Sequence, residues 1–153
     1  MLRAASIDDL QAVEALTAEA YAPYTRLLGR SPIPVTEDYA LRIERGEVWL
    51  LEVQGALAGL AVVERHGDHV MLFSIAVSPK FQGGGNGLAI LRWVENMARD
   101  GRLPEVRLYT NARMERNIAL YKAFGFQETG RRENPQRPGW VIVDMAKQVG
   151  AQG

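Results

Sequence analysis

Residues 76–91 read AVSPKFQGGGNGLAIL, where an apolar segment runs through Pro79 into a glycine-rich loop and then into a segment with helical periodicity. The four glycines between Gln82 and Leu88 leave backbone N–H groups unobstructed at the positive end of the predicted helix. Such a row of amides can hold a pyrophosphate group. The alternative interpretation is a turn that requires glycine only for its positive φ angles. The stretch thus predicts a strand, a loop and a helix, with the loop as a candidate anion site.

Other phosphate-binding loops fit this stretch less well. A Walker loop would need Gly-Lys-Ser/Thr, which is absent, and Ile90 stands where a dinucleotide-binding fingerprint has its third glycine. That fingerprint also follows the first strand of a βαβ unit, whereas three predicted antiparallel strands precede this loop.

The three strands before the loop are predicted from apolar runs and turn residues. They cover Val48–Val53, Leu57–Glu64 and His69–Val77, with hairpin turns at Gln54-Gly55 and Gly67-Asp68. The third run, VMLFSIAV, hardly alternates between apolar and polar residues, so both of its faces must be covered. We therefore expect it to be a central strand.

The remaining elements are predicted from capping residues and helical spacing. Ser6 and Asp9 form a variant capping box, Asn111 is a predicted N-cap, and Gly125 is a predicted helix stop. The order β-α-α-β-β-β-α-β-α-β-β predicts one α/β domain over residues 1–153 with a mixed, mainly antiparallel sheet. These elements are a strand at Leu2–Ala5 with a capped helix after it, helices at Thr36–Arg45, Gly83–Arg99 and Ala112–Phe124, and strands at Val106–Tyr109, Phe126–Arg132 and Trp140–Lys147.

Composition argues against several classes of function. The 153 residues include 18 basic and 18 acidic side chains, so the chain lacks the basic excess typical of nucleic-acid binding. The absence of cysteine excludes disulfides, thiolate metal sites and a cysteine nucleophile, and it is typical of a reducing compartment. Asp8 and Asp9 break the first apolar stretch, so no signal peptide is expected, and the longest apolar run, Val70–Val77, is too short to span a membrane. We expect a cytoplasmic protein that binds neither nucleic acid nor membrane.

A second motif, YTNARMERNIALYKAFGF, covers residues 109–126. Asn117 and Tyr121 stand four residues apart and so share one face of the predicted helix. A phenol near a leaving thiolate can donate a proton, because its pKa of about 10 lies just above the value of about 8.5 for a thiol. The alternative is that Tyr121 only packs with Ile118 and Phe124.

Five stretches together resemble a known family. They are LRAASIDDLQAV (2–13), AVSP (76–79), QGGGNG (82–87), LYTN (108–111) and NIALYKAFGFQETGRR (117–132). In these motifs and in its order of elements, the chain resembles the GCN5-related N-acetyltransferases, the GNAT family. The resemblance implies a central strand that carries a bulge and splays from the next strand, with acyl-CoA in the gap.

The resemblance also implies which residues form the site. The pantetheine arm of acetyl-CoA would pair with the backbone at Ile75 and Val77, and the N–H of Ile75 would polarise the thioester carbonyl. Tyr121 would protonate the departing coenzyme A, and Asn117 matches a position that often contacts the cofactor. No metal is expected. The pyrophosphate would lie on the amides of Gln82, Gly83, Gly84, Gly85, Asn86 and Gly87.

The implied activity is an acetyl-CoA-dependent N-acetyltransferase that acts on a primary amine by direct attack. No cysteine is present to carry a thioester intermediate. The central strand has no acidic residue from Val70 to Ser78, which leaves water relayed to Ser74, Glu64 or Glu52 as the candidate route for the amine proton. The alternative function is a non-catalytic acyl-CoA-binding or regulatory module. A polyamine, an amino acid, an antibiotic, a peptide terminus and a lysine side chain all remain possible acceptors.

Two residues depart from the usual family pattern, and two further groups lie outside it. Gln82 stands where arginine is commoner, and Asn86 replaces an aliphatic residue at the helix start. His66 and His69 would face each other across a hairpin end, but two ligands and an optional Asp68 are too few for a zinc site. The arginines at 131, 132 and 137 are typical of a solvated loop.

Aromatic residues suggest either an acceptor pocket or a packed core. Both interpretations fit Tyr21, Tyr24, Tyr39, Trp49 and Trp140. The last predicted strand, near Trp140, would be exposed and could pair with a second chain, which makes a homodimer possible.

Overall fold

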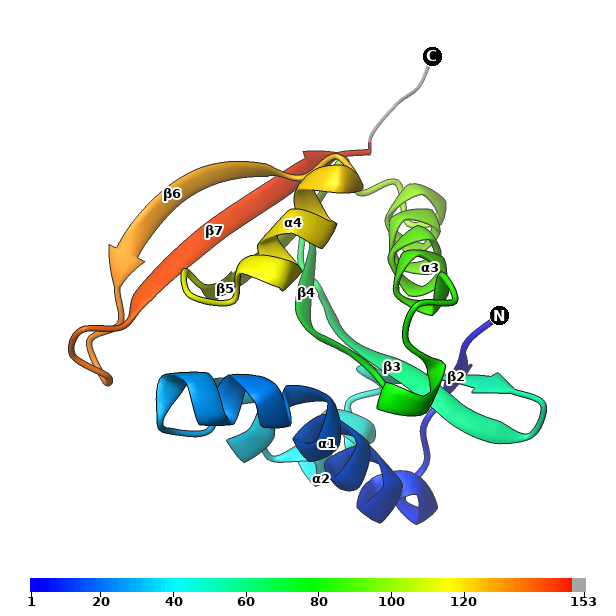
Figure 1. Ribbon diagram of the computed structural model, residues 1–153. Helices are drawn as coiled ribbons and strands as arrows, with labels where there is room; N and C mark the ends of the chain where they lie inside the picture. The colour runs from blue at the N-terminus through cyan, green and yellow to red at the C-terminus, as the bar shows by residue number, and fades with distance from the viewer. Residues whose placement is uncertain (150–153) are drawn as a thin grey trace. The chain divides into compact units, whose positions relative to one another are not determined.

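Seven strands hydrogen-bond side by side in the order β1-β2-β3-β4-β5-β7-β6 (Figure 1). The structure is a computed structural model and describes residues 1–149. Its contacts group into two compact units: unit 1 comprises Met1–Glu64 and Phe73–Val94, and unit 2 comprises Arg65–Leu72 and the residues from Glu95 onward. Strand β4 and helix α3 therefore contribute residues to both units.

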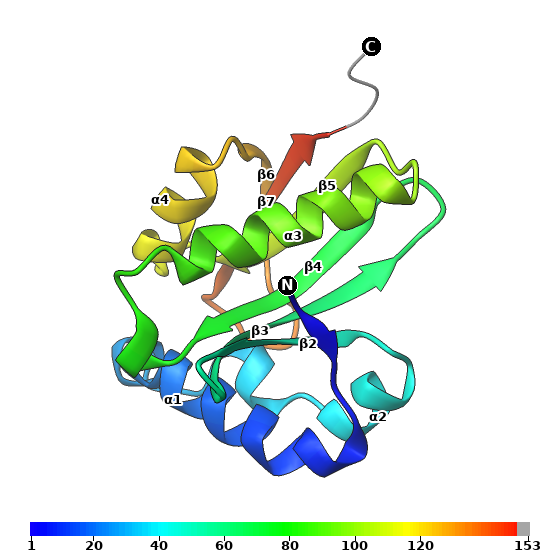
Figure 2. The same ribbon diagram turned by 90° about the vertical axis from the view of Figure 1, so that its right-hand side faces the viewer.

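Unit 1 combines the first strands with the first helices. Helices α1 and α2 lie on one side of β2 and β3 (Figure 2), and Ile90 of α3 packs against β3 at Gly59. The elements that begin in unit 1 are β1 (Arg3–Ala4), the 3₁₀ helix η1 (Ile7–Asp9), α1 (Leu10–Leu28), the 3₁₀ helix η2 (Ile33–Thr36), α2 (Tyr39–Glu44), β2 (Val48–Val53), β3 (Ala56–Arg65), the 3₁₀ helix η3 (Pro79–Phe81) and α3 (Asn86–Asp100).

Unit 2 contains the first residues of β4 (Val70–Val77) and the C-terminal elements. These are β5 (Glu105–Asn111), α4 (Glu115–Ala123), β6 (Gln127–Glu133) and β7 (Val141–Gln148). The parallel ladder between β4 and β5 is short: it pairs Val70–Leu72 with Val106–Leu108, although β4 continues to Val77 and β5 to Asn111.

The predicted strands and their order along the chain are confirmed. Gln54 and Gly55 have φ angles of 52° and 80°, which suit the two-residue hairpin that joins β2 to β3 in antiparallel register. Six of the eight residues of β4 are buried, as expected of a strand with both faces covered. The fold class is therefore the mixed α/β sheet that the sequence predicts.

Three predicted helix starts are wrong. Helix α2 begins at Tyr39 and not at Thr36, because Asp38 caps it by accepting the N–H of Leu41 at 3.1 Å. Helix α4 begins at Glu115 because the side chain of Asn111 accepts the N–H of Arg113 at 2.8 Å and closes a turn before the helix, instead of capping it. Helix α3 begins at Asn86 because Gly83 and Gly85 have φ angles of 82° and 83°, which a right-handed helix does not allow.

The prediction that the last strand is an exposed edge is also wrong. Strand β7 pairs with β5 on one side and with β6 on the other, so β6 is the edge strand. An exposed edge near Trp140 therefore no longer supports a homodimer.

Gly59 allows β3 to approach its neighbours closely, and Gly59→Ala is expected to destabilise unit 1. A Cβ at this position would lie 2.9 Å from the carbonyl oxygen of Ala76 and 2.9 Å from Cδ1 of Ile90. Overpacking of this kind typically costs about 1–3 kcal/mol. Chemical denaturation should show this loss for Gly59→Ala and little change for Gly130→Ala, since a Cβ at Gly130 in β6 meets no atom within 4 Å. Equal stability of the two variants would contradict the prediction.

The Asp9 carboxylate ties the start of the first helical segment to β1, and its contribution should depend on pH. It accepts the N–H of Ser6 at 2.8 Å and two bonds from Arg3 at 3.0 and 3.1 Å. These bonds, that from Arg3 first, lower the pKa of Asp9 to about 2. A lowered pKa stabilises the fold fully above the unfolded value of about 3.9 and progressively less as pH falls towards 2. In thermal denaturation, Asp9→Asn should be less stable than the parent at pH 6, and the gap should narrow between about pH 4 and pH 2. A gap independent of pH would refute this role.

Candidate functional site

The glycine-rich loop in unit 1 forms an open backbone surface before α3. A Cβ at Gly83 or Gly85 would meet no atom within 4 Å, so the space over both residues is free. The side chain of Asn86 donates to the carbonyl of Phe81 at 2.9 Å and holds the loop against η3. Asn86, which stands where the family usually has an aliphatic residue, therefore has a structural role: its side chain holds the loop immediately before the helix.

The electrostatics of this segment suit an anion. Helix α3 presents its positive end to the loop. Residues 73–94 contain Lys80 and Arg92 but no aspartate or glutamate. An anion over the loop would thus meet backbone amides and a net charge of +2 from this segment.

Strand β4 leads into the loop, and side chains hold two of its carbonyl groups. The carbonyl of Ile75 accepts the hydroxyl of Tyr21 at 3.2 Å, and the carbonyl of Val77 accepts Nε2 of Gln82 at 3.2 Å. Ile75, Val77 and the loop from Gln82 to Gly87 all belong to one continuous segment of unit 1, Phe73–Val94. Sequence reasoning missed both side-chain contacts. Tyr21 is 54 residues from Ile75 and no local pattern links them.

Tyr121 and Asn117 lie in α4, in unit 2. Tyr121 is buried, and its ring packs edge-on against Phe126 with 5.9 Å between ring centroids. Asn117 is half-buried one helical turn earlier. The stop after α4 is confirmed, since Gly125 has a φ angle of 108°.

The carboxylates considered as bases are held in ion pairs. In unit 1, the guanidinium of Arg42 contacts Glu37 at 2.6 Å, Glu47 at 3.1 Å and also Glu64, and it lies 4.1 Å from the ring centroid of Phe73. Burial alone would lower the pKa of Arg42, but hydrogen bonds to the three carboxylates outweigh this effect and raise the pKa above its usual range. Glu64 therefore has a structural partner.

The other two base candidates also have partners. Glu52 accepts a hydrogen bond from Arg3 at 3.0 Å on the exposed surface. Ser74 is buried, with its hydroxyl 3.3 Å from that of Tyr21. No candidate base is therefore assigned.

The aromatic residues of unit 1 pack mainly as core. Tyr21 and Tyr39 are buried, and the Tyr39 hydroxyl donates to the carbonyl of Pro34 at 2.5 Å. Trp49 packs against Trp93 with 4.9 Å between ring centroids. The packed-core interpretation holds for these residues.

The histidines and arginines of unit 2 have local partners. The rings of His66 and His69 stack with centroids 4.7 Å apart, as predicted for a hairpin end. Within residues 1–149, no three His, Asp or Glu side chains gather in a group that could hold a metal ion. Arg131 pairs with Glu128, Arg132 with Asp144, and Arg137 stacks on Trp140 at 4.6 Å.

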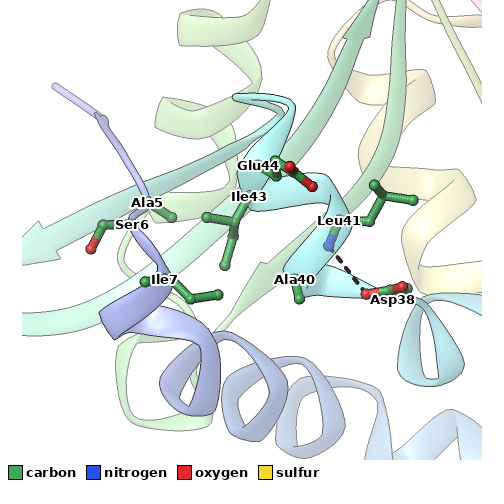
Figure 3. Close-up of a pocket in the computed structure, with 8 residues that line it drawn as sticks. All are labelled: Ala5, Ser6, Ile7, Asp38, Ala40, Leu41, Ile43 and Glu44. Carbon is green, nitrogen blue, oxygen red and sulfur yellow. Dashed lines mark hydrogen bonds between the residues drawn. The ribbon is translucent and has the colours of Figure 1, made fainter.

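A surface pocket of about 660 Å³ lies between η1 and α2 in unit 1 (Figure 3). The predicted site residues do not line it, and Asp38 at its rim caps α2 by accepting the N–H of Leu41 at 3.1 Å. The lining residues are Ala5, Ser6, Ile7, Asp38, Ala40, Leu41, Ile43 and Glu44. The loop before α3, and not this pocket, carries the features of an anion site.

Comparison with known proteins gives matches over most of the chain. The model of the acetyltransferase (GNAT) family matches residues 11–126. The mouse protein called probable N-acetyltransferase family 8 member 5 is 33% identical over 104 residues, which cover 64% of this chain and 46% of the mouse protein. The chain spans about half the length of the first curated relatives that it matches.

Solved structures share the fold. The ribosomal-protein-S18-alanine N-acetyltransferase from Escherichia coli superposes with a TM-score of 0.78 at 24% identity, over 100% of this chain and 96% of that one. The PaiA N-acetyltransferase from Thermoplasma acidophilum, solved in complex with coenzyme A, gives a TM-score of 0.78 at 16% identity, over 97% and 98% of the two chains. Among the described helices, none has both the length and the apolar character needed to cross a membrane.

Proposed function

Because the chain belongs to the acetyltransferase (GNAT) family, we propose that it transfers the acetyl group of acetyl-CoA to the amino nitrogen of an acceptor. The observation that carries this proposal is the loop from Gln82 to Gly87. Its open backbone stands at the positive end of α3 in a segment without carboxylates. These features fit the pyrophosphate of coenzyme A.

Different residues would bind different parts of acetyl-CoA. The amides of the loop hold the pyrophosphate, and the backbone of Ile75 and Val77 pairs with the pantetheine arm. Asn117 would add a polar contact from α4. The backbone N–H of Gln82 would be one of the loop amides that bind the pyrophosphate, while its side chain donates to the carbonyl of Val77.

The chemistry would be a direct displacement at the thioester carbon. The neutral amine attacks this carbon, and the N–H of Ile75 stabilises the oxyanion that forms. Tyr121 then donates its phenolic proton to sulfur as the carbon–sulfur bond breaks. The nitrogen loses one proton to water, and water returns a proton to the Tyr121 oxygen. The products are an amide and free coenzyme A.

The acceptor in this proposal is a primary amine. The E. coli structural neighbour is named for the alanine of a ribosomal protein, so a peptide amino terminus is one candidate among the primary amines. A cytoplasmic location and a homodimer also remain proposals.

An assay of coenzyme A release tests the function. Purified protein with acetyl-CoA should release free thiol only when an acceptor is present, across a panel of peptides with free amino termini, polyamines, amino acids and aminoglycosides. Calorimetry with acetyl-CoA alone would run in parallel. Binding without release for any amine would favour the non-catalytic module, and no binding would refute the proposal.

A further inference from the structure

The carbonyl of Ile75 receives its hydrogen bond from a side chain. Buried backbone carbonyls almost always have a partner, and Ile75 is 7% exposed. Its partner is the hydroxyl of Tyr21 on α1, at 3.2 Å. Tyr21 is itself buried at 5% exposure, so this bond joins α1 to β4 inside unit 1.

The same hydroxyl also contacts the residue before Ile75. The oxygen of Tyr21 lies 3.3 Å from Oγ of Ser74. A phenol has one proton, and a carbonyl can only accept, so the Tyr21 proton points to Ile75. The hydroxyl of Ser74 then donates to the Tyr21 oxygen. The result is a directed chain from Ser74 through Tyr21 to the carbonyl of Ile75.

These two hydrogen bonds hold groups on both sides of the Ile75 amide. The Ser74 side chain is held before the amide, and the Ile75 carbonyl is held after it. Burial raises the pKa of Tyr21 and keeps its hydroxyl protonated as a donor. Tyr21, which precedes Ile75 by 54 positions, thus contacts one group on each side of the Ile75 amide.

We propose that Tyr21 is a positioning residue for acyl transfer, which orients the Ile75 N–H towards the oxyanion through its bond to the Ile75 carbonyl. The proposal rests on the function proposed above. It assigns Tyr21 no contact with either substrate. Ile75 is only one of the positions proposed to bind coenzyme A, so the effect of Tyr21 should appear mainly in turnover, with the affinity for coenzyme A changed by no more than about twofold.

The variant Tyr21→Phe tests this role. It keeps the ring and removes the proton, and one hydrogen bond corresponds to about a three- to tenfold change. We expect kcat to fall by about that factor, with the Kd for coenzyme A unchanged within about twofold. Ser74→Ala removes only the hydrogen bond from Ser74 to the Tyr21 oxygen and should lower kcat less. The double variant should be no slower than Tyr21→Phe, because the two residues act through one chain.

Tyr39→Phe is the matched control. It removes a buried hydroxyl that donates to a carbonyl, but that carbonyl belongs to Pro34 and not to β4. If Tyr39→Phe lowers kcat as much as Tyr21→Phe, the positioning role is refuted. It is equally refuted if Tyr21→Phe keeps parental kcat. If Tyr21→Phe does not fold, Ser74→Ala decides the question. A decrease in its kcat with normal coenzyme A affinity supports the positioning role, and an unchanged kcat overturns it.

A second readout separates this inference from the proposed function. NMR of labelled protein should show a larger shift of the Ile75 amide with acetyl-CoA than with coenzyme A, since only the former carries the acyl carbonyl. Tyr21→Phe should remove that difference, whereas Tyr39→Phe should retain it. If the parent shows no amine-dependent turnover, the proposed function fails, and this shift alone decides the role of Tyr21. A difference that survives in Tyr21→Phe would overturn the role.

Discussion

Replacing Tyr121 by phenylalanine is expected to lower turnover by about 10²- to 10⁴-fold, the typical contribution of a positioned proton donor. The change keeps the ring, so the edge-on contact with Phe126 is retained. Affinity for coenzyme A and the thermal midpoint should therefore stay close to those of the parent. Steady-state kinetics at saturating acetyl-CoA on a confirmed acceptor measure the effect.

The packing interpretation of Tyr121 makes a different prediction. If the buried hydroxyl only serves a hydrogen bond, its loss lowers stability and leaves chemistry intact. Turnover within about twofold of the parent would then be observed, and it would remove the catalytic assignment. A single-turnover measurement is needed, because slow product release can hide a change in the chemical step. Tyr39→Phe gives the control for loss of a buried phenol elsewhere.

Local signals in the sequence were sufficient for most elements. The Gln54-Gly55 turn and the largely apolar run of β4 each depend on neighbouring residues, and both are found as predicted. The start of α4 was missed because asparagine has two uses: its side chain can cap a helix or close a turn before one. Asn111 closes the turn, and the sequence does not distinguish these outcomes.

Contacts distant in sequence were beyond local reasoning. The expectation of an exposed last strand failed because strand order depends on pairing across the chain, and β6 lies outside β7. The contact of Tyr21 with Ile75 has no local signal at all. The residues from Gln82 to Gly87 could be proposed as a site from the sequence because the glycines and the start of a helix are adjacent there.

Replacing Gly85 by valine is expected to weaken the binding of coenzyme A by about tenfold or more, which corresponds to about 1.4 kcal/mol of binding free energy. The space over Gly85 is open in the structure, since a Cβ there would meet no atom within 4 Å. A pyrophosphate that lies on the loop amides needs this space. Branched carbons would occupy it and keep the phosphate oxygens from the N–H groups. Calorimetric titration with coenzyme A measures the loss directly and requires no acceptor.

The φ angle of Gly85, 83°, makes strain the competing explanation, because L side chains rarely adopt this conformation. Gly46→Val gives a matched control, since Gly46 has a φ angle of 72°, open space around it, and a position after α2, away from the loop. Both variants should lose stability, and only Gly85→Val should lose affinity. Gly85→Ala keeps the strain and adds a single methyl group, so it should bind between the parent and Gly85→Val. Parental affinity in a folded Gly85→Val protein would show that the pyrophosphate does not lie on these amides, and the site would have to be sought elsewhere in the chain.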